Sequence, residues 1–180
     1  RGAGYEFLDA VKGGTIPGVF MPAVEKGVRQ ALEAGVVAGY PVQDIRVVVY
    51  DGKHHPVDSK EVAFVVAGRK AVIAAVKAAS PILLEPIVNI EILGPESAIG
   101  DLAADIAGKR GHVTGTLPRG SGVAISGEVP LAELTDYQSR LRSLTSGQGS
   151  FSLEFSRYAA VPAAVQQSLM SQCKAQEEED

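Results

Sequence analysis

His112-Val113-Thr114-Gly115-Thr116-Leu117 is followed, after Pro118, by the turn Arg119-Gly120-Ser121-Gly122 and then by Val123-Ala124-Ile125-Ser126-Gly127-Glu128-Val129. In the last of these runs, apolar residues alternate with small or polar ones, which predicts a strand with one buried face. The short glycine-rich turn predicts that this strand pairs with the preceding one as a β-hairpin.

The elements on either side of the hairpin complete a compact unit. A strand at about 87–93 and a helix from about Ser97 to Gly108 precede it. A helix that begins at Pro130 and ends before Ser146 follows it, and then a strand at 151–155. The order β-α-β-β-α-β predicts a ferredoxin-like split unit.

The first half of the chain also alternates strands and helices. We expect a strand at 4–9, a helix from Pro22 to Gly35, a strand at 42–50 and a helix that runs to about Ala79. Residues 47–50 of the second strand are continuously apolar, which predicts burial away from water. The fold class is therefore α+β, with two two-layer α/β sandwich domains.

The second of these helices has a capping signal at its predicted start. Asp58 and Glu61 have the spacing of a capping box, in which the first side chain accepts a hydrogen bond from a backbone N–H of the first turn. We therefore expect the helix to begin at Asp58.

Two prolines mark a boundary between the halves. Pro81 and Pro86 keep the segment 80–86 extended and out of a helix. We expect a first domain at 1–80, a ferredoxin-like domain at 81–161, and a C-terminal helix with an acidic tail at 162–180. That helix carries Val165 and Leu169 on one side, and we expect it to pack back on the first domain.

The composition, with 46% hydrophobic and 21% charged residues, is that of a globular protein and excludes a disordered tail. The single cysteine, Cys173, excludes an internal disulfide and a zinc site built from cysteines. The longest apolar runs are far shorter than the roughly 20 residues of a membrane helix, so we expect no membrane partner. The chain begins without a methionine, so we expect a piece of a longer protein. We also expect a cytoplasmic protein and a monomer.

The net charge of −4 argues against binding nucleic acid through bulk charge. Without the four acidic residues 177–180, the chain has 17 basic and 17 acidic residues. Contact with nucleic acid would then depend on local basic turns, such as Lys109 with Arg110, or Arg140 with Arg142. Each pair lies near the predicted end of a helix, where cations also stabilise the helix dipole. Both interpretations stay open at this point.

Motifs of several enzyme classes are absent from the sequence. It contains no P-loop, no dinucleotide-binding glycine motif and no nucleophile elbow. The adjacent His54 and His55 lie on a predicted turn, and two imidazoles without a third ligand hold zinc poorly, so we expect no metal site. A stand-alone ferredoxin-like domain with a regulatory or hydrolytic role stays open, because this fold does not determine function.

Two sets of short runs stand out along the sequence. The first set is 4–7 (GYEF), 13–17 (GGTIP), 22–27 (PAVEKG), 38–42 (AGYPV) and 50–59 (YDGKHHPVDS). The second set is 81–87 (PILLEPI), 100–102 (GDL), 110–111 (RG), 129–134 (VPLAEL) and 141–145 (LRSLT). In the same order, the first set resembles the fourth domain of bacterial elongation factor G, and the second set resembles its fifth domain. The resemblance therefore spans almost the whole chain.

This resemblance implies a C-terminal fragment, domains IV and V, of elongation factor G or a close paralogue. The first domain would be ribosomal-protein-S5-domain-2-like but incomplete, without its first strands, and the second would be complete. The GTPase domain of the family is absent, so the chain itself would hydrolyse no GTP. GTP and Mg²⁺ are implied for the parent protein, and no cofactor is implied for the chain.

The implied function is to promote translocation of tRNA and mRNA on the ribosome, as a rigid wedge that biases which arrangement of tRNAs is populated. In the family, the tip of the fourth domain reaches the decoding centre. The corresponding residues here are Gly52, Lys53, His54, His55, Pro56 and Asp58, with His55 in the place of the tip histidine. The family's contact with the sarcin–ricin loop of ribosomal RNA falls at Arg142, Ser143 and Ser146.

The sequence departs from the family pattern at both places. His54 stands where a tyrosine is usual, and Ser146 and Gln148 stand where longer polar or basic residues are common. A ribosome-recycling or ribosomal-protection paralogue therefore stays an alternative. The pattern at 52–58 favours a translocase over a tetracycline-protection protein.

Overall fold

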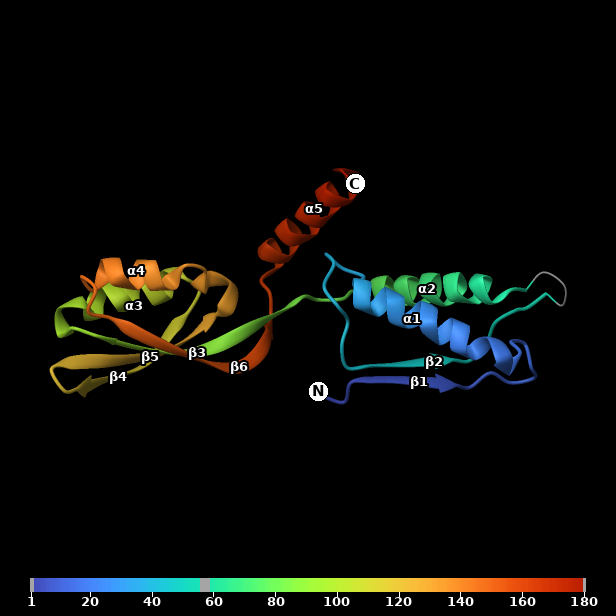
Figure 1. Cartoon of the computed structure of the whole chain (residues 1–180), viewed down its shortest axis with the longest axis horizontal. Coiled ribbons are helices and arrows are strands. Elements are labelled where there is room, and N and C mark those ends of the chain that lie inside the picture. Colours follow the sequence, from blue (N-terminus) through green and yellow to red (C-terminus); the bar gives the residue numbers. More distant parts are fainter. Residues whose placement is uncertain (1, 56–58, 180) are drawn as a thin grey trace. The chain divides into compact units, whose positions relative to one another are not determined.

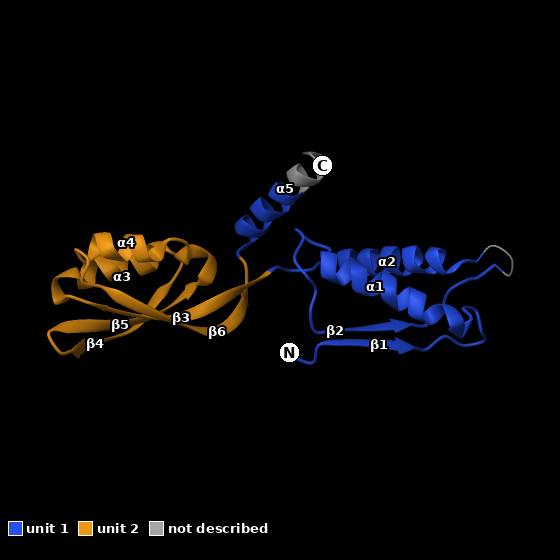
Figure 2. Ribbon diagram, viewed as in Figure 1, with its two compact units in different colours: residues 1–83, 162–180 blue, residues 84–161 orange. Residues whose placement is uncertain are grey.

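The computed structural model describes residues 2–55 and 59–179, with side chains described up to residue 173. The chain divides into two compact units, which we call unit 1 (residues 1–83 with 162–180) and unit 2 (residues 84–161) (Figure 2). Within the described ranges, no helix is long and apolar enough to cross a membrane.

Unit 1 alternates strands and helices. Its elements are β1 (Tyr5–Asp9), α1 (Met21–Ala34), β2 (Ile45–Val49), α2 (Glu61–Ala78) and, at the end of the chain, α5 (Ala163–Glu179). The two strands are parallel, in a register that runs from the pair Tyr5 and Ile45 to the pair Asp9 and Val49. Figure 1 shows α1 and α2 side by side along one face of these strands, where their apolar side chains form the core.

The start and end of α1 follow the sequence signals. Pro22 occupies the first turn, where its missing N–H costs no hydrogen bond. Gly35 ends the helix with a φ of +82°, a value that glycine adopts without strain. The prediction of burial at residues 47–50 is wrong for Val48 and Tyr50, which are 43% and 78% exposed. In the described structure the helices cover only one face of the sheet, so alternate residues of β2 face solvent.

The predicted start of α2 is also wrong. The helix begins at Glu61, and its N-cap residue Lys60 has an extended backbone and makes no side-chain cap. Asp58 lies outside the described residues. The Oγ of Ser59 accepts a hydrogen bond from the backbone N–H of His55, so Ser59 closes the preceding loop and is not part of the helix.

Two glycines let α1 and α2 approach each other closely. A Cβ atom on Gly27 would lie 1.9 Å from the carbonyl oxygen of Val65, and one on Gly68 would lie 2.6 Å from that of Val24. Gly68 is otherwise unfavourable inside a helix, so the close crossing explains its presence there.

Unit 2 has the predicted ferredoxin-like order. Its elements are β3 (Leu84–Gly94), α3 (Ile99–Gly108), β4 (His112–Arg119), β5 (Gly122–Pro130), α4 (Tyr137–Leu144) and β6 (Ser150–Ala160). The strands form one sheet in the order β4-β5-β3-β6, and every neighbouring pair is antiparallel. The α+β fold class, with two two-layer domains, is confirmed.

The helix predicted to begin at Pro130 is two separate pieces. A 3₁₀ turn spans Leu131–Leu134, and α4 begins only at Tyr137. Between them, Thr135 is extended and Asp136 has a φ of +55°, so the helical hydrogen bonding is interrupted. The apolar spacing could not reveal this break, because Leu134 and Tyr137 are both buried in the same core.

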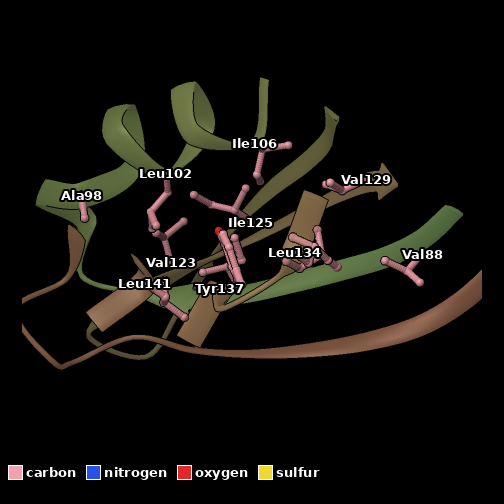
Figure 3. Close-up of a cluster of buried hydrophobic side chains, with 12 residues drawn as sticks. Val88, Ala98, Leu102, Ile106, Val123, Ile125, Val129, Leu134, Tyr137 and Leu141 are labelled. Atoms are coloured by element: carbon pink, nitrogen blue, oxygen red, sulfur yellow. The ribbon is translucent and has the colours of Figure 1, made fainter. Parts of the chain in front are cut away.

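The core of unit 2 lies between the sheet and the helices α3 and α4 (Figure 3). Ile92, Leu102, Ile125 and Leu141 in this core are fully buried. The ring of Tyr137 packs edge-on against Phe151, with centroids 5.1 Å apart. The Tyr137 hydroxyl is buried without a hydrogen-bond partner among the described residues.

A β-bulge interrupts the pairing of β3 with β6. Ile87 pairs with Arg157 and Val88 pairs with Phe155, so Ser156 has no partner across the ladder. The extra residue lets two consecutive side chains, Ser156 and Arg157, both bind the carboxylate of Glu128 on β5.

Replacing Gly27 with alanine should destabilise unit 1. The added Cβ would overlap the Val65 carbonyl oxygen, and overpacking of this kind costs about 1–3 kcal/mol. Hydrogen exchange should show weaker protection of the amides in α1 and α2. Gly100→Ala is the control, since a Cβ there meets nothing within 4 Å. Unchanged protection of unit 1 in Gly27→Ala would contradict the close helix crossing.

Burial, and then the nearby Asp105 carboxylate, raise the pKa of Tyr137 from 10.0 to about 12. The neutral phenol therefore stabilises unit 2 below pH 10, and this stabilisation is lost as the pH rises from about 10 to 12. Tyr137→Phe should remove alkaline destabilisation of about 1.4 kcal/mol, one pH unit beyond pH 10, as measured by urea unfolding at pH 8 and pH 11. Tyr50→Phe, at an exposed position, is the control. An equal alkaline loss in Tyr137→Phe and the parent would refute this.

Candidate nucleic-acid interface

The parallel pairing of β1 and β2 brings two loops to one end of unit 1. Since the strands run in the same direction, the connection from β1 to α1 and the connection from β2 to α2 both leave the carboxyl edge of the sheet (Figure 1). The ladder continues into the first connection, where the backbone N–H of Ala10 donates to the carbonyl of Val49 at 2.8 Å. We call residues 51–55 the tip loop and residues 13–17 the companion loop.

The predicted tip residues Gly52, Lys53, His54 and His55 lie in this tip loop, whereas Pro56 and Asp58 fall outside the described residues. Lys53, His54 and His55 are exposed. Gly52 is half-buried, and its N–H donates to the carboxylate of Asp51 at 2.8 Å.

Two hydrogen-bonded contacts hold the tip loop, one on each side of the peptide that joins the histidines. The Nδ1 atom of His54 lies 3.0 Å from the carbonyl oxygen of Thr15 in the companion loop. The N–H of His55 donates to the Oγ of Ser59 at 2.8 Å, and the N–H of Ser59 donates to the carbonyl of His55 at 3.1 Å. The tip loop is thus tied both to the companion loop and to the chain that enters α2.

The sequence prediction did not include Thr15, Ile16 or Ser59 in the site. The order of elements in the sequence could have indicated Thr15 and Ile16, because a β-α-β-α order with parallel strands brings the loops after both strands to the same edge. Motif spacing along the chain cannot find such neighbours, since Thr15 and His54 are 39 residues apart.

The second predicted set, Arg142, Ser143 and Ser146, lies together at the C-terminal end of α4. All three side chains are exposed. Ser146 has a φ of +53°, and the N–H of Gly147 donates to the carbonyl of Arg142 at 2.8 Å, which is the arrangement of a Schellman helix end. The three residues therefore follow one defined turn.

A buried threonine supports this turn from below. Thr145 is 2% exposed, and its hydroxyl donates to the carbonyl of Leu141 and accepts from the N–H of Gly149, both at 2.8 Å. One side chain thus satisfies two backbone groups between the end of α4 and the start of β6.

The basic pair Lys109 and Arg110 is used inside unit 2. Two guanidinium nitrogens of Arg110 each bind one carboxylate oxygen of Glu85 at 2.8 Å, and its Nε binds Glu133 at 2.7 Å. These hydrogen bonds raise the pKa of Arg110 further above its already high value. Lys109 donates to the backbone carbonyl of Glu133. The structural interpretation of this pair is therefore the one that the contacts support.

The described side chains form no cluster of three or more His, Cys, Asp or Glu residues that could hold a metal ion. The arrangement at the tip offers hydrogen-bond donors and acceptors on exposed imidazoles and a cation on Lys53, which suits contact with RNA better than covalent chemistry.

Comparison with known proteins was made for the whole chain. The family "Elongation factor G, domain IV" matches residues 1–80, and the family "Elongation factor G C-terminus" matches residues 82–169. An elongation factor G-like protein of Thermotoga maritima is 45% identical over 173 residues, which are 96% of this chain and 25% of that protein. A crystal structure of a Thermus thermophilus protein superposes with a TM-score of 0.77 at 37% identity, over 96% of this chain and 26% of that one. The chain thus spans about a quarter of the length of these relatives.

Thr145→Val should destabilise unit 2 by about 1–3 kcal/mol, because the part-buried N–H of Gly149 loses its hydrogen-bond acceptor while the side-chain shape is kept. The carbonyl of Leu141 loses one of two donors and keeps the backbone N–H of Thr145. The amide of Gly149 should also exchange faster with solvent. Thr116→Val, at an exposed position of β4, is the matched control and should be nearly neutral. If both variants unfold at the same urea concentration as the parent, the Thr145 hydroxyl does not support the turn.

Proposed function

Because the chain belongs to the elongation factor G family, we propose that it is the ribosome-contacting part of a translational GTPase that promotes movement of tRNA and mRNA during protein synthesis. The matched regions are domain IV and the C-terminus, which include no GTPase domain, so this chain is not itself the catalytic part. GTP and Mg²⁺ would be bound elsewhere in the parent protein, which would act as a monomer in the cytoplasm.

The observation that carries this proposal is the fixed presentation of His55 at the tip of unit 1. Its side chain is exposed, while its backbone N–H and carbonyl are both bonded to Ser59. An exposed imidazole on an anchored backbone suits contact with an RNA surface, because imidazole nitrogens can donate or accept hydrogen bonds. In this proposal, the tip loop contacts the decoding centre and the complex of tRNA with mRNA.

The proposed mechanism is steric. The close crossing of α1 and α2 stiffens the body behind the tip, because their backbones meet at Gly27 and Gly68 without intervening side chains. A stiff body that fits only one arrangement of the tRNAs shifts the population toward that arrangement.

Unit 2 would contact ribosomal RNA at the sarcin–ricin loop through Arg142, Ser143 and Ser146. Four of its arginines bind carboxylates, namely Arg110, Arg119, Arg140 and Arg157. Arg142 makes no ion pair with the described residues and is exposed, so its charge is available for a phosphate.

A ribosome-recycling paralogue is the second candidate. It is favoured by His54, which stands where the family usually has a tyrosine, and by a relative that is described as elongation factor G-like. The stand-alone ferredoxin-like domain has no such support, because it accounts for unit 2 alone whereas the family matches cover both units.

His55→Ala in the full-length protein should slow tRNA movement on pre-translocation ribosomes by about tenfold, the effect of losing roughly 1.4 kcal/mol of transition-state stabilisation. GTP hydrolysis should persist, because the GTPase domain is elsewhere in the protein. The measurement is single-round translocation followed by stopped flow, with His112→Ala of unit 2 as the control.

Equal translocation rates for His55→Ala and the parent would remove the proposed role of the tip. Absence of tRNA movement with either protein, together with splitting of ribosomal subunits when recycling factor is added, would identify the recycling paralogue.

A further inference from the structure

A side-chain hydrogen bond joins the tip loop to the companion loop. The His54 Nδ1 atom lies 3.0 Å from the carbonyl oxygen of Thr15, across 39 residues of sequence. A carbonyl oxygen can only accept a hydrogen bond, so Nδ1 must carry the proton. In the neutral ring, this leaves Nε2 as a hydrogen-bond acceptor.

A second contact supports the same junction two residues earlier. A Cβ atom on Gly52 would lie 2.3 Å from the Cδ1 atom of Ile16, so the backbone of the tip loop rests directly on that side chain. Ile16 is 8% exposed and belongs to the core cluster with Met21 and Phe64. The companion loop is therefore anchored in the core and gives the tip loop a fixed base.

The other side of the histidine pair is held by Ser59, through the two hydrogen bonds to the backbone of His55. The ring of His54 is bonded to the companion loop, and the backbone of His55 is bonded to Ser59. Both side chains are exposed.

We infer that His54 is a positioning residue: its Nδ1–H bond to the Thr15 carbonyl locks the tip loop onto the companion loop and so sets the place from which His55 meets RNA. This inference rests on the proposed function of the tip.

The kinetic test compares two substitutions of His54 in the full-length protein. His54→Leu removes the hydrogen bond and should slow single-round translocation about three- to tenfold, as expected for the loss of one ordinary hydrogen bond. His54→Asn places an amide N–H near the position of Nδ1 and should restore the rate to within about twofold of the parent. His112→Leu makes the same change in unit 2 and serves as the control.

The spectroscopic test uses the 180-residue chain labelled with ¹⁵N. At a pH where the ring is neutral, the His54 nitrogens should show a protonated Nδ1 and an unprotonated Nε2. A ring protonated on Nε2 would overturn the inference, because that tautomer cannot donate to Thr15.

The kinetic outcomes separate the inference from the proposed function. If His54→Leu translocates like the parent while His55→Ala is slow, the positioning role is wrong and the function of the tip stands. If His54→Leu and His54→Asn are equally slow, the ring itself is required and the positioning role is again wrong. If neither His54→Leu nor His55→Ala is slow, the proposed function fails as well.

Discussion

Parallel pairing of β1 with β2 is the constraint on which the arrangement of unit 1 depends. It sends both connecting loops to the same edge of the sheet. The two long helices α1 and α2 pack on one face of these strands, where they share the same core. Gly27 and Gly68 let the backbones of α1 and α2 cross closely on that face. The contact between His54 and Thr15 is possible only because the parallel strands bring their loops to the same edge.

Much of the fold could be predicted from the sequence, because it follows from local periodicity. The hairpin of β4 and β5 has alternating residues and a glycine-rich turn, and α1 has a proline at its start and a glycine at its end. The local pattern gave the wrong element where the same residues were compatible with two different structures. Asp58 and Glu61 fit a helix start, but the helix begins only at Glu61 and its N-cap is Lys60. Leu134 and Tyr137 fit one helix, but they lie on two separate pieces. The partner of His54 was missed because it lies in another loop, which only the topology brings near.

Most arginines of unit 2 form ion pairs with carboxylates of the same unit. Arg110 binds both carboxylate oxygens of Glu85, a residue that is only 9% exposed, and it also binds Glu133. Exposed pairs such as Arg119 with Glu91 contribute little to stability, but they still neutralise the surface. The net charge of −4 is therefore compatible with the proposed contact with RNA, for which Arg142, without an ion pair among the described residues, is the candidate cation.

Because of the bulge at Ser156, the number of residues in β6 determines which side chains contact Glu128. Ser156 and Arg157 share one carboxylate, Glu128, only because an extra residue interrupts the alternation of faces. A homologue that lost this residue would keep the strand but would turn Ser156 or Arg157 away from Glu128. A gap in β6 in an alignment of homologues would thus mark the loss of one of the two contacts to Glu128. A comparison of the aligned residues alone would not show this loss.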